Sequence, residues 1–239
     1  MKHLKARISN SHVNKNLEIK ADRIIDLLQD VEGIHIHSLT EFTNYLNENN
    51  LGVFLLYRQV DIIGRAKFNE EVTLTTYPYN TTKASGYRHI YMYGENGDPL
   101  VKTNSFGAFV NLDTLRPVRL PEEIINSIGD KSQDPTIENL PRRIKYNDTN
   151  LKLIEKIPVR KAFIDRYNHL NNAHYVSFAL NNMEYNSFTR IRAEYKDSFQ
   201  LNDVIYVYEA LDNENKTFVY KNDEGRIYTV IEFSNPTFK

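Results

Sequence analysis

Residues 163–175 hold the densest group of side chains in the chain that could do acid–base chemistry. The segment contains a carboxylate at Asp165, an imidazole at His169 and two adjacent carboxamides at Asn171 and Asn172. An apolar segment with helical periodicity follows directly, so these polar groups precede a predicted helix start. Because histidine can accept and return a proton near neutral pH, we interpret this segment as a candidate active site.

A simpler interpretation of the same segment is a capped helix start, in which Asp and Asn side chains bond to the local backbone. Capping accounts for one or two polar residues. It does not account for a carboxylate, an imidazole and two carboxamides together, so the functional interpretation is favoured. The basic cluster at 142–145 also has two interpretations, a docking surface for an acidic partner or a solvated linker.

Composition and charge exclude several classes of function. The 239 residues are 41% hydrophobic and 26% charged with a net charge of −1, so no global field attracts nucleic acid or an anionic membrane. The absence of cysteine removes disulfides, thiolate metal sites and a cysteine nucleophile. His35 and His37 have strand-type spacing for a metal, but no other ligand is evident, and we predict no metal site. The N-terminal residues lack the pattern of a signal peptide and no stretch reaches the roughly 18 apolar residues of a membrane span, so we expect a cytoplasmic location.

The periodicity of the chain predicts the same series of elements twice: a strand, a helical segment and then four antiparallel strands. In the first half these elements are expected at 6–14, 17–31 (with a second short helix at 39–46), 51–63, 71–77, 86–93 and 100–110. In the second half they are expected at 157–163, 172–185, 188–195, 204–210, 217–220 and 227–233. Prolines punctuate the segment between the halves, so we predict an α+β protein with units at 1–116 and 151–239 joined by a linker at 117–150.

The pattern Asp165-x-x-x-His169-x-Asn171-Asn172-x-x-Tyr175, at a sheet-to-helix turn of a duplicated α+β chain, resembles the acyl-acyl-carrier-protein (acyl-ACP) thioesterases. Further segments similar to that family are 21–30, 68–74, 86–88 and 112–124. The resemblance implies a tandem (double) hotdog fold, in which two antiparallel sheets each wrap a long helix. It also implies a hydrolase that releases free fatty acid from acyl-ACP in fatty acid biosynthesis, without a cofactor. The implied partner is acyl carrier protein bearing a fatty acyl thioester, and the enzyme would be a monomer or a homodimer.

The chain departs from the family pattern near the histidine. The family commonly has Asn two residues before it, where this chain has Tyr167, with Asn168 one residue later. A further acidic or Cys residue of the family lies at the start of a strand after the helix, and Asp197 and Ser198 are the candidates here. The resemblance therefore implies two sets of site residues. The catalytic candidates are Asp165, His169, Asn168, Ser198 and Asp197, and the candidates for substrate binding are Asn171, Asn172, Tyr167 and Tyr175.

Thioester hydrolysis requires an activated nucleophile, a stabilised oxyanion and a dry channel for the acyl chain. His169 would exchange the proton, whereas Asp165 could orient the imidazole, act as the base for water, or attack the carbonyl itself. Unpaired backbone N–H groups at the predicted helix start would form the oxyanion hole. Two alternatives stay open: an acyl-CoA thioesterase with the same residues, and a non-catalytic acyl-binding hotdog module, which Tyr167 in place of Asn would allow.

Overall fold

The computed structural model describes residues 1–183, 188–211 and 215–238. The chain divides into two compact units, Met1–Asn139 and Leu140–Lys239. Of the segment predicted to be a linker, residues 117–139 therefore belong to the first unit and residues 140–150 to the second.

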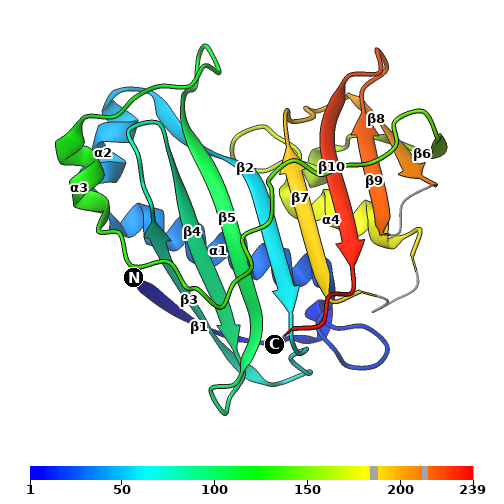
Figure 1. The fold of residues 1–239 in the computed structure, drawn as a ribbon, viewed down its shortest axis with the longest axis horizontal. Helices are drawn as coiled ribbons and strands as arrows, with labels where there is room; N and C mark the ends of the chain where they lie inside the picture. The colour runs from blue at the N-terminus through cyan, green and yellow to red at the C-terminus, as the bar shows by residue number, and fades with distance from the viewer. Residues whose placement is uncertain (184–187, 212–214, 239) are drawn as a thin grey trace. The chain divides into compact units, whose positions relative to one another are not determined.

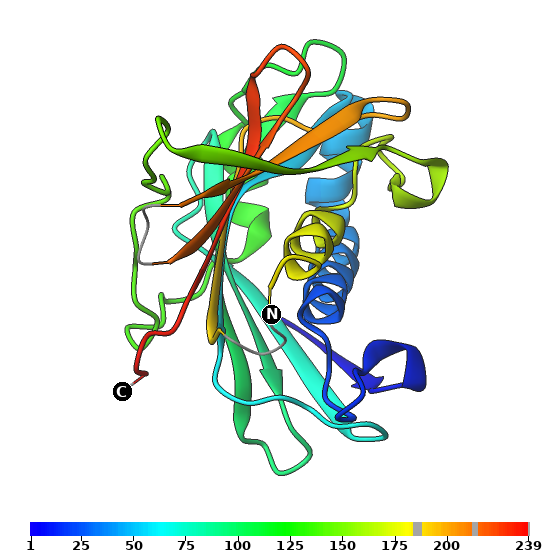
Figure 2. The same cartoon turned by 90° about the vertical axis from the view of Figure 1, so that its right-hand side faces the viewer.

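The first unit is an antiparallel sheet with a long helix on one face. Its strands are ordered β1-β3-β4-β5-β2. The helix α1 buries an apolar stripe that includes Ile24, Leu28 and Val31, and it packs against β1, β3 and β4. Figure 2 shows α1 along one face of this sheet. The elements are β1 (Lys2–Arg7), α1 (Ala21–Ser38), α2 (Thr40–Glu48), β2 (Leu51–Ile62), β3 (Glu71–Tyr79), β4 (Ser85–Tyr93), β5 (Pro99–Asn111) and α3 (Glu122–Ile128) (Figure 1).

The second unit repeats this arrangement with a shorter helix. Its strands are ordered β7-β10-β9-β8-β6, all antiparallel, and its helix α4 packs against β10 (Figure 1). Residues 140–150 join the core of this unit through Ile144, which packs with Val219 and Val230. The elements are β6 (Leu151–Pro158), α4 (Asn172–Leu180), β7 (Arg190–Tyr195), β8 (Val204–Ala210), β9 (Lys216–Lys221) and β10 (Ile227–Ser234).

The predicted antiparallel strands with a helix against them are confirmed in each unit, but four boundaries are corrected. The first strand was predicted at 6–14, whereas β1 ends at Arg7 and Asn10–His12 form a 3₁₀ turn. The strand predicted at 157–163 ends at Pro158, which has no N–H to donate, and Lys161–Phe163 form a 3₁₀ turn. The first helix was predicted at 17–31 but begins at Ala21 and continues through Gly33 to Ser38. The second helix was predicted to reach residue 185, whereas α4 ends at Leu180; residue 185 itself lies outside the described residues.

Candidate active site

A closed backbone turn holds Asp165 and His169 together. One carboxylate oxygen of Asp165, Oδ1, accepts hydrogen bonds from the N–H groups of Tyr167 (2.8 Å) and His169 (3.2 Å). The Asp165 N–H donates to the His169 carbonyl at 2.8 Å, and the Asn168 N–H donates to the Asp165 carbonyl at 3.1 Å. Asn168 lies at the tip with a φ of +62°, which asparagine tolerates better than most residues. Asp165 thus positions His169 through its backbone, and the exposed Asn168 shapes the turn.

The first unit contains the same turn, built by an asparagine. There Oδ1 of Asn14 accepts from the N–H groups of Asn16 (2.7 Å) and Glu18 (3.0 Å), and Leu17 has a φ of +62°. The Asn14 N–H donates to the Glu18 carbonyl at 2.9 Å, as Asp165 does to His169. An uncharged carboxamide is therefore sufficient to build the turn. The negative charge at position 165 and the imidazole at 169 are not needed for the backbone geometry.

The start of α4 leaves one backbone donor available. Asn171 caps the helix, because its Oδ1 accepts from the Ala173 N–H at 2.9 Å while its carbonyl accepts from the His174 N–H at 2.9 Å. Within the described part of the chain, the Asn172 N–H and carboxamide have no hydrogen-bond partner. A helix start carries partial positive charge, so the Asn172 N–H is available to donate to a negatively charged group.

The two further catalytic candidates, Asp197 and Ser198, differ in their environment. The Leu170 N–H donates to the Phe199 carbonyl at 2.8 Å, which brings Ser198 beside the turn. The Ser198 hydroxyl itself donates only a long bond, 3.4 Å, to the Phe199 carbonyl. The Asp197 carboxylate forms an ion pair with Arg226 at 2.6 Å. Ser198 is therefore the better placed of the two to assist at the turn, although its role stays a prediction.

The two tyrosines predicted to bind substrate lie in opposite environments. Tyr167 is 51% exposed, and its hydroxyl accepts a hydrogen bond from Arg166 at 2.6 Å while the guanidinium also lies over its ring. Tyr175 is buried against Tyr195 and Tyr220, and burial raises the pKa of its hydroxyl. Tyr175 thus anchors α4 in the core, whereas Tyr167 faces solvent at the tip of the turn.

A second buried polar cluster, in the first unit, was missed at the sequence level. Arg58 is 1% exposed; it donates to the Ser105 hydroxyl at 3.0 Å and pairs with Glu32. Arg88 also lies near Glu32, at 3.5 Å, and donates to Nδ1 of His35 at 2.7 Å. Two guanidinium groups therefore share one carboxylate between α1 and the sheet, and that of Arg88 also bonds to the imidazole. The sequence signal was a run of polar residues, Arg58, Gln59 and Asp61, inside a largely apolar strand.

This cluster predicts that stability depends on His35 below neutral pH. Burial, with the positive charge of Arg88, lowers the pKa of His35 from 6.5 to about 3, so the folded protein keeps this imidazole neutral. The unfolded chain takes up the proton first as pH falls. The contribution of His35 to the free energy of unfolding is therefore complete above about pH 6.5. As the pH falls from there toward pH 3, the free energy of unfolding declines by about 1.4 kcal/mol per pH unit. Urea unfolding between pH 7 and 4 should show a shallower decline for His35→Gln than for the wild type. Identical declines for the two proteins would contradict this assignment.

Within the described ranges, no cluster of three or more His, Asp or Glu side chains could hold a metal ion. No helix in those ranges is long and apolar enough to cross a membrane.

Comparison with known proteins identifies the relatives of this architecture. Residues 1–128 match a family model described as the acyl-ACP thioesterase N-terminal domain. The structure is similar to an acyl-ACP thioesterase from Bacteroides thetaiotaomicron VPI-5482, with a TM-score of 0.86, 18% identity, and coverage of 98% of this chain and 96% of that one. It is also similar to the 12:0-ACP thioesterase from Umbellularia californica, with a TM-score of 0.82, 14% identity and the same coverage. A search of curated proteins finds no match. The tandem hotdog fold predicted from the sequence is confirmed by these structures.

Proposed function

Because the chain belongs to the acyl-ACP thioesterase family, we propose that it hydrolyses the thioester of fatty acyl-ACP and releases free fatty acid for fatty acid biosynthesis. The observation that carries the proposal is the pair of matching turns. Both turns have the same backbone geometry, but only the second carries a carboxylate at Asp165 and an imidazole at His169. The first has Asn14 and Glu18 at these places. The first turn shows that neither a carboxylate at position 165 nor an imidazole at position 169 is needed for this backbone geometry.

The proposed reaction uses water as the nucleophile. His169 accepts a proton from water as the water oxygen bonds to the thioester carbon. The developing oxyanion accepts a hydrogen bond from the Asn172 N–H, and one such donor is typically worth about 3 kcal/mol. The tetrahedral intermediate collapses with cleavage of the C–S bond, and His169 returns the proton to the departing sulfur. The charge of Asp165 favours the protonated imidazole between these two steps.

The paired turns predict the outcome of Asp165→Asn. The carboxamide keeps an Oδ1 that can accept from both N–H groups, as Asn14 does, so the melting temperature should stay within a few degrees of the wild type. Loss of the negative charge should lower kcat by about 10- to 1,000-fold, because the positive charge that His169 carries during the reaction would lose a nearby opposite charge. Asp165→Ala should lose both the activity and part of the stability. Full activity in Asp165→Asn would show that the carboxylate is only structural.

The choice of carrier is tested by comparing substrates with the same acyl group. We expect kcat/KM for acyl-ACP to exceed that for acyl-CoA. A clear preference for acyl-CoA would replace the proposed function with that of an acyl-CoA thioesterase. A cytoplasmic location, and a monomer or homodimer as the assembly, stay predictions from the sequence.

A further inference from the structure

The outer face of the second unit's sheet carries apolar and aromatic side chains where polar ones are usual. In β8, Val207 lies opposite Tyr220, whose hydroxyl donates to a backbone carbonyl of α4, so Val207 points toward the helix. Side chains alternate along a strand, and Val204, Tyr206 and Tyr208 therefore point to the outer face. Val204 is 38% exposed and both tyrosines are half-buried. Because the solvated face of an antiparallel sheet is normally polar, this outer face is a candidate for contact with a partner.

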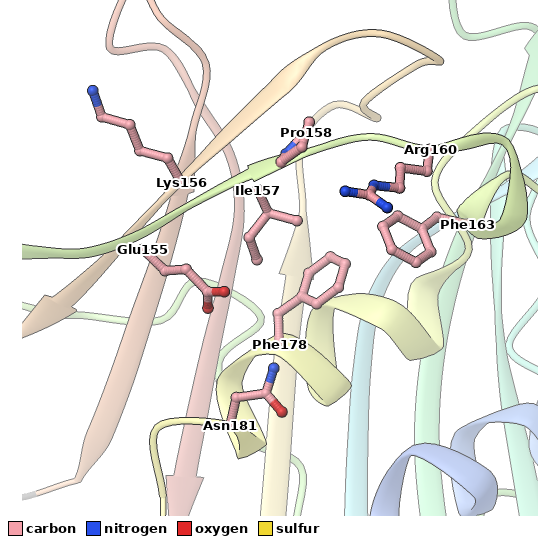
Figure 3. Close-up of a pocket in the computed structure, with 8 residues that line it drawn as sticks. All are labelled: Glu155, Lys156, Ile157, Pro158, Arg160, Phe163, Phe178 and Asn181. Atoms are coloured by element: carbon pink, nitrogen blue, oxygen red, sulfur yellow. The ribbon is translucent and has the colours of Figure 1, made fainter.

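The neighbouring strands extend the outer face and add positive charge. Leu153 of β6 lies opposite Tyr208 and is 41% exposed. Tyr206 has Lys156 of β6 opposite it on one side and Lys221 of β9 on the other. The amine of Lys156 lies 4.8 Å from the ring centroid of Tyr206, and that of Lys221 lies 4.9 Å from that of Tyr208. Figure 3 shows Lys156 pointing away from α4 and from the hollow between β6 and that helix. The lysines thus lie on the same face as the tyrosines.

The basic cluster at 142–145 belongs to the same face. Ile144 packs with Val219, which lies opposite Tyr208, so this segment crosses the outer side of the sheet. Arg143 and Lys145 flank Ile144 in the sequence and are exposed. The sequence left two interpretations of the cluster open, and its place beside the aromatic side chains favours a docking surface over a solvated linker.

The cations of the outer face are available to an external anion, although the net charge of the whole chain is −1. In the parts of the chain that the structure describes, no ion pair engages four of them: Arg143, Lys145, Lys156 and Lys221. Glu194 accepts a hydrogen bond from the Ile144 N–H at 3.0 Å but already pairs with Lys196 at 3.3 Å. Asp148 is an exposed carboxylate of the same segment, and with it counted the face stays positive. A local positive field around apolar side chains is complementary to an anionic surface.

We propose that the outer face docks the protein reversibly on an anionic lipid surface. Tyrosine and lysine side chains are favoured at the level of lipid headgroups, where the ring is partly dehydrated and the amine is attracted by the negative surface. A second copy of the face would place cations against cations, so a symmetric dimer does not fit it. The face spreads over three strands and one covering segment, whereas an amphipathic helix of a protein partner lies in a groove. Lipid docking goes beyond the proposed thioesterase function and does not depend on it.

Co-sedimentation of the full chain with lipid vesicles tests the proposal. The wild type should bind vesicles that contain phosphatidylglycerol, bind vesicles of phosphatidylcholine alone about tenfold more weakly, and dissociate at high salt, which screens exposed charges. Lys156→Gln should weaken binding to the anionic vesicles about fivefold, and Lys156→Gln with Lys221→Gln about 25-fold, since each cation near such a surface contributes about a factor of five. Leu153→Gln removes an apolar contact without a change of charge and should weaken binding to both kinds of vesicle.

Arg160→Gln is the matched control for the loss of a lysine. Arg160 is also an exposed cation of the second unit, but it stands at the edge of the hollow between β6 and α4, away from the outer face (Figure 3). This variant should bind both kinds of vesicle as the wild type does.

Several outcomes would overturn the inference. Absence of binding of the wild type to anionic vesicles would exclude lipid as the partner of this face. Equal binding of the wild type and the double lysine variant would show that another surface holds the vesicle, and an equal loss in Arg160→Gln would indicate net charge rather than this face. If vesicles are not bound and only the KM for acyl-ACP rises in the lysine variants, the face docks an acidic carrier protein instead. Thiol release without vesicles tests the proposed function separately, so either proposal can fail alone.

Discussion

His169→Ala is expected to lower kcat for thioester hydrolysis by about 100- to 10,000-fold, the range usual for loss of a general base. The backbone of the turn does not depend on the imidazole, because Asp165 bonds to the backbone N–H of His169 and the first unit builds the same turn with Glu18. The variant should therefore fold, with a melting temperature near that of the wild type. Release of free thiol from acyl-ACP, measured under saturating substrate, gives kcat directly.

The matched control for this prediction is His37→Ala. His37 is an exposed histidine on α1, so its removal tests the effect of losing an imidazole outside the candidate site. This control should retain wild-type kcat. Unchanged kcat in His169→Ala would remove the imidazole from the mechanism. An equal fall in the control would indicate a general defect in the protein.

Glu32→Ala is expected to lower the free energy of unfolding by about 3–5 kcal/mol, the cost of leaving a buried charge without its partner. Glu32 pairs with Arg58, which is 1% exposed, and lies 3.5 Å from Arg88. Nη1 of Arg58 is buried and has no hydrogen-bond partner in the described structure, so losing Glu32 would leave this guanidinium with Ser105 alone. Urea unfolding at neutral pH measures the change.

Asp30→Ala is the control for Glu32→Ala. Asp30 lies on the same helix but is exposed, so its removal should change stability by no more than about 0.5 kcal/mol. A loss below about 1 kcal/mol in Glu32→Ala would show that the two arginines find other partners or water, and that the cluster is not a major element of the fold.

Most of the fold was predictable because its signals are local. The hairpin between β4 and β5 is an example: alternating residues flank a turn in which Gly97 has a φ of +81°, a conformation that glycine adopts without strain. The boundaries of α1 were less predictable. The residues before Ala21 have helical periodicity, but Ile19 is held by a hydrogen bond to the Ala66 carbonyl at 2.9 Å, a contact from a distant part of the chain.

The location of the candidate site was predictable, but not the partners of its residues. A carboxylate before a helix start can be a cap, a base or both, and only the observed bonds to the Tyr167 and His169 N–H groups show that Asp165 supports the turn. The pairing of Asp197 with Arg226 depends on where the β9–β10 hairpin meets β7. The pairing of Arg58 with Ser105 depends on the register between β2 and β5. Such registers are properties of the assembled sheet.

The most direct test of the central claim is a time course of thiol release from fatty acyl-ACP by the purified wild-type protein across a series of acyl chain lengths. Thioester hydrolysis at the His169 turn predicts release of many equivalents of thiol and free fatty acid per protein molecule for at least one chain length. Binding of acyl chains without release of thiol from any acyl thioester would contradict the claim and identify the chain as a non-catalytic acyl-binding module.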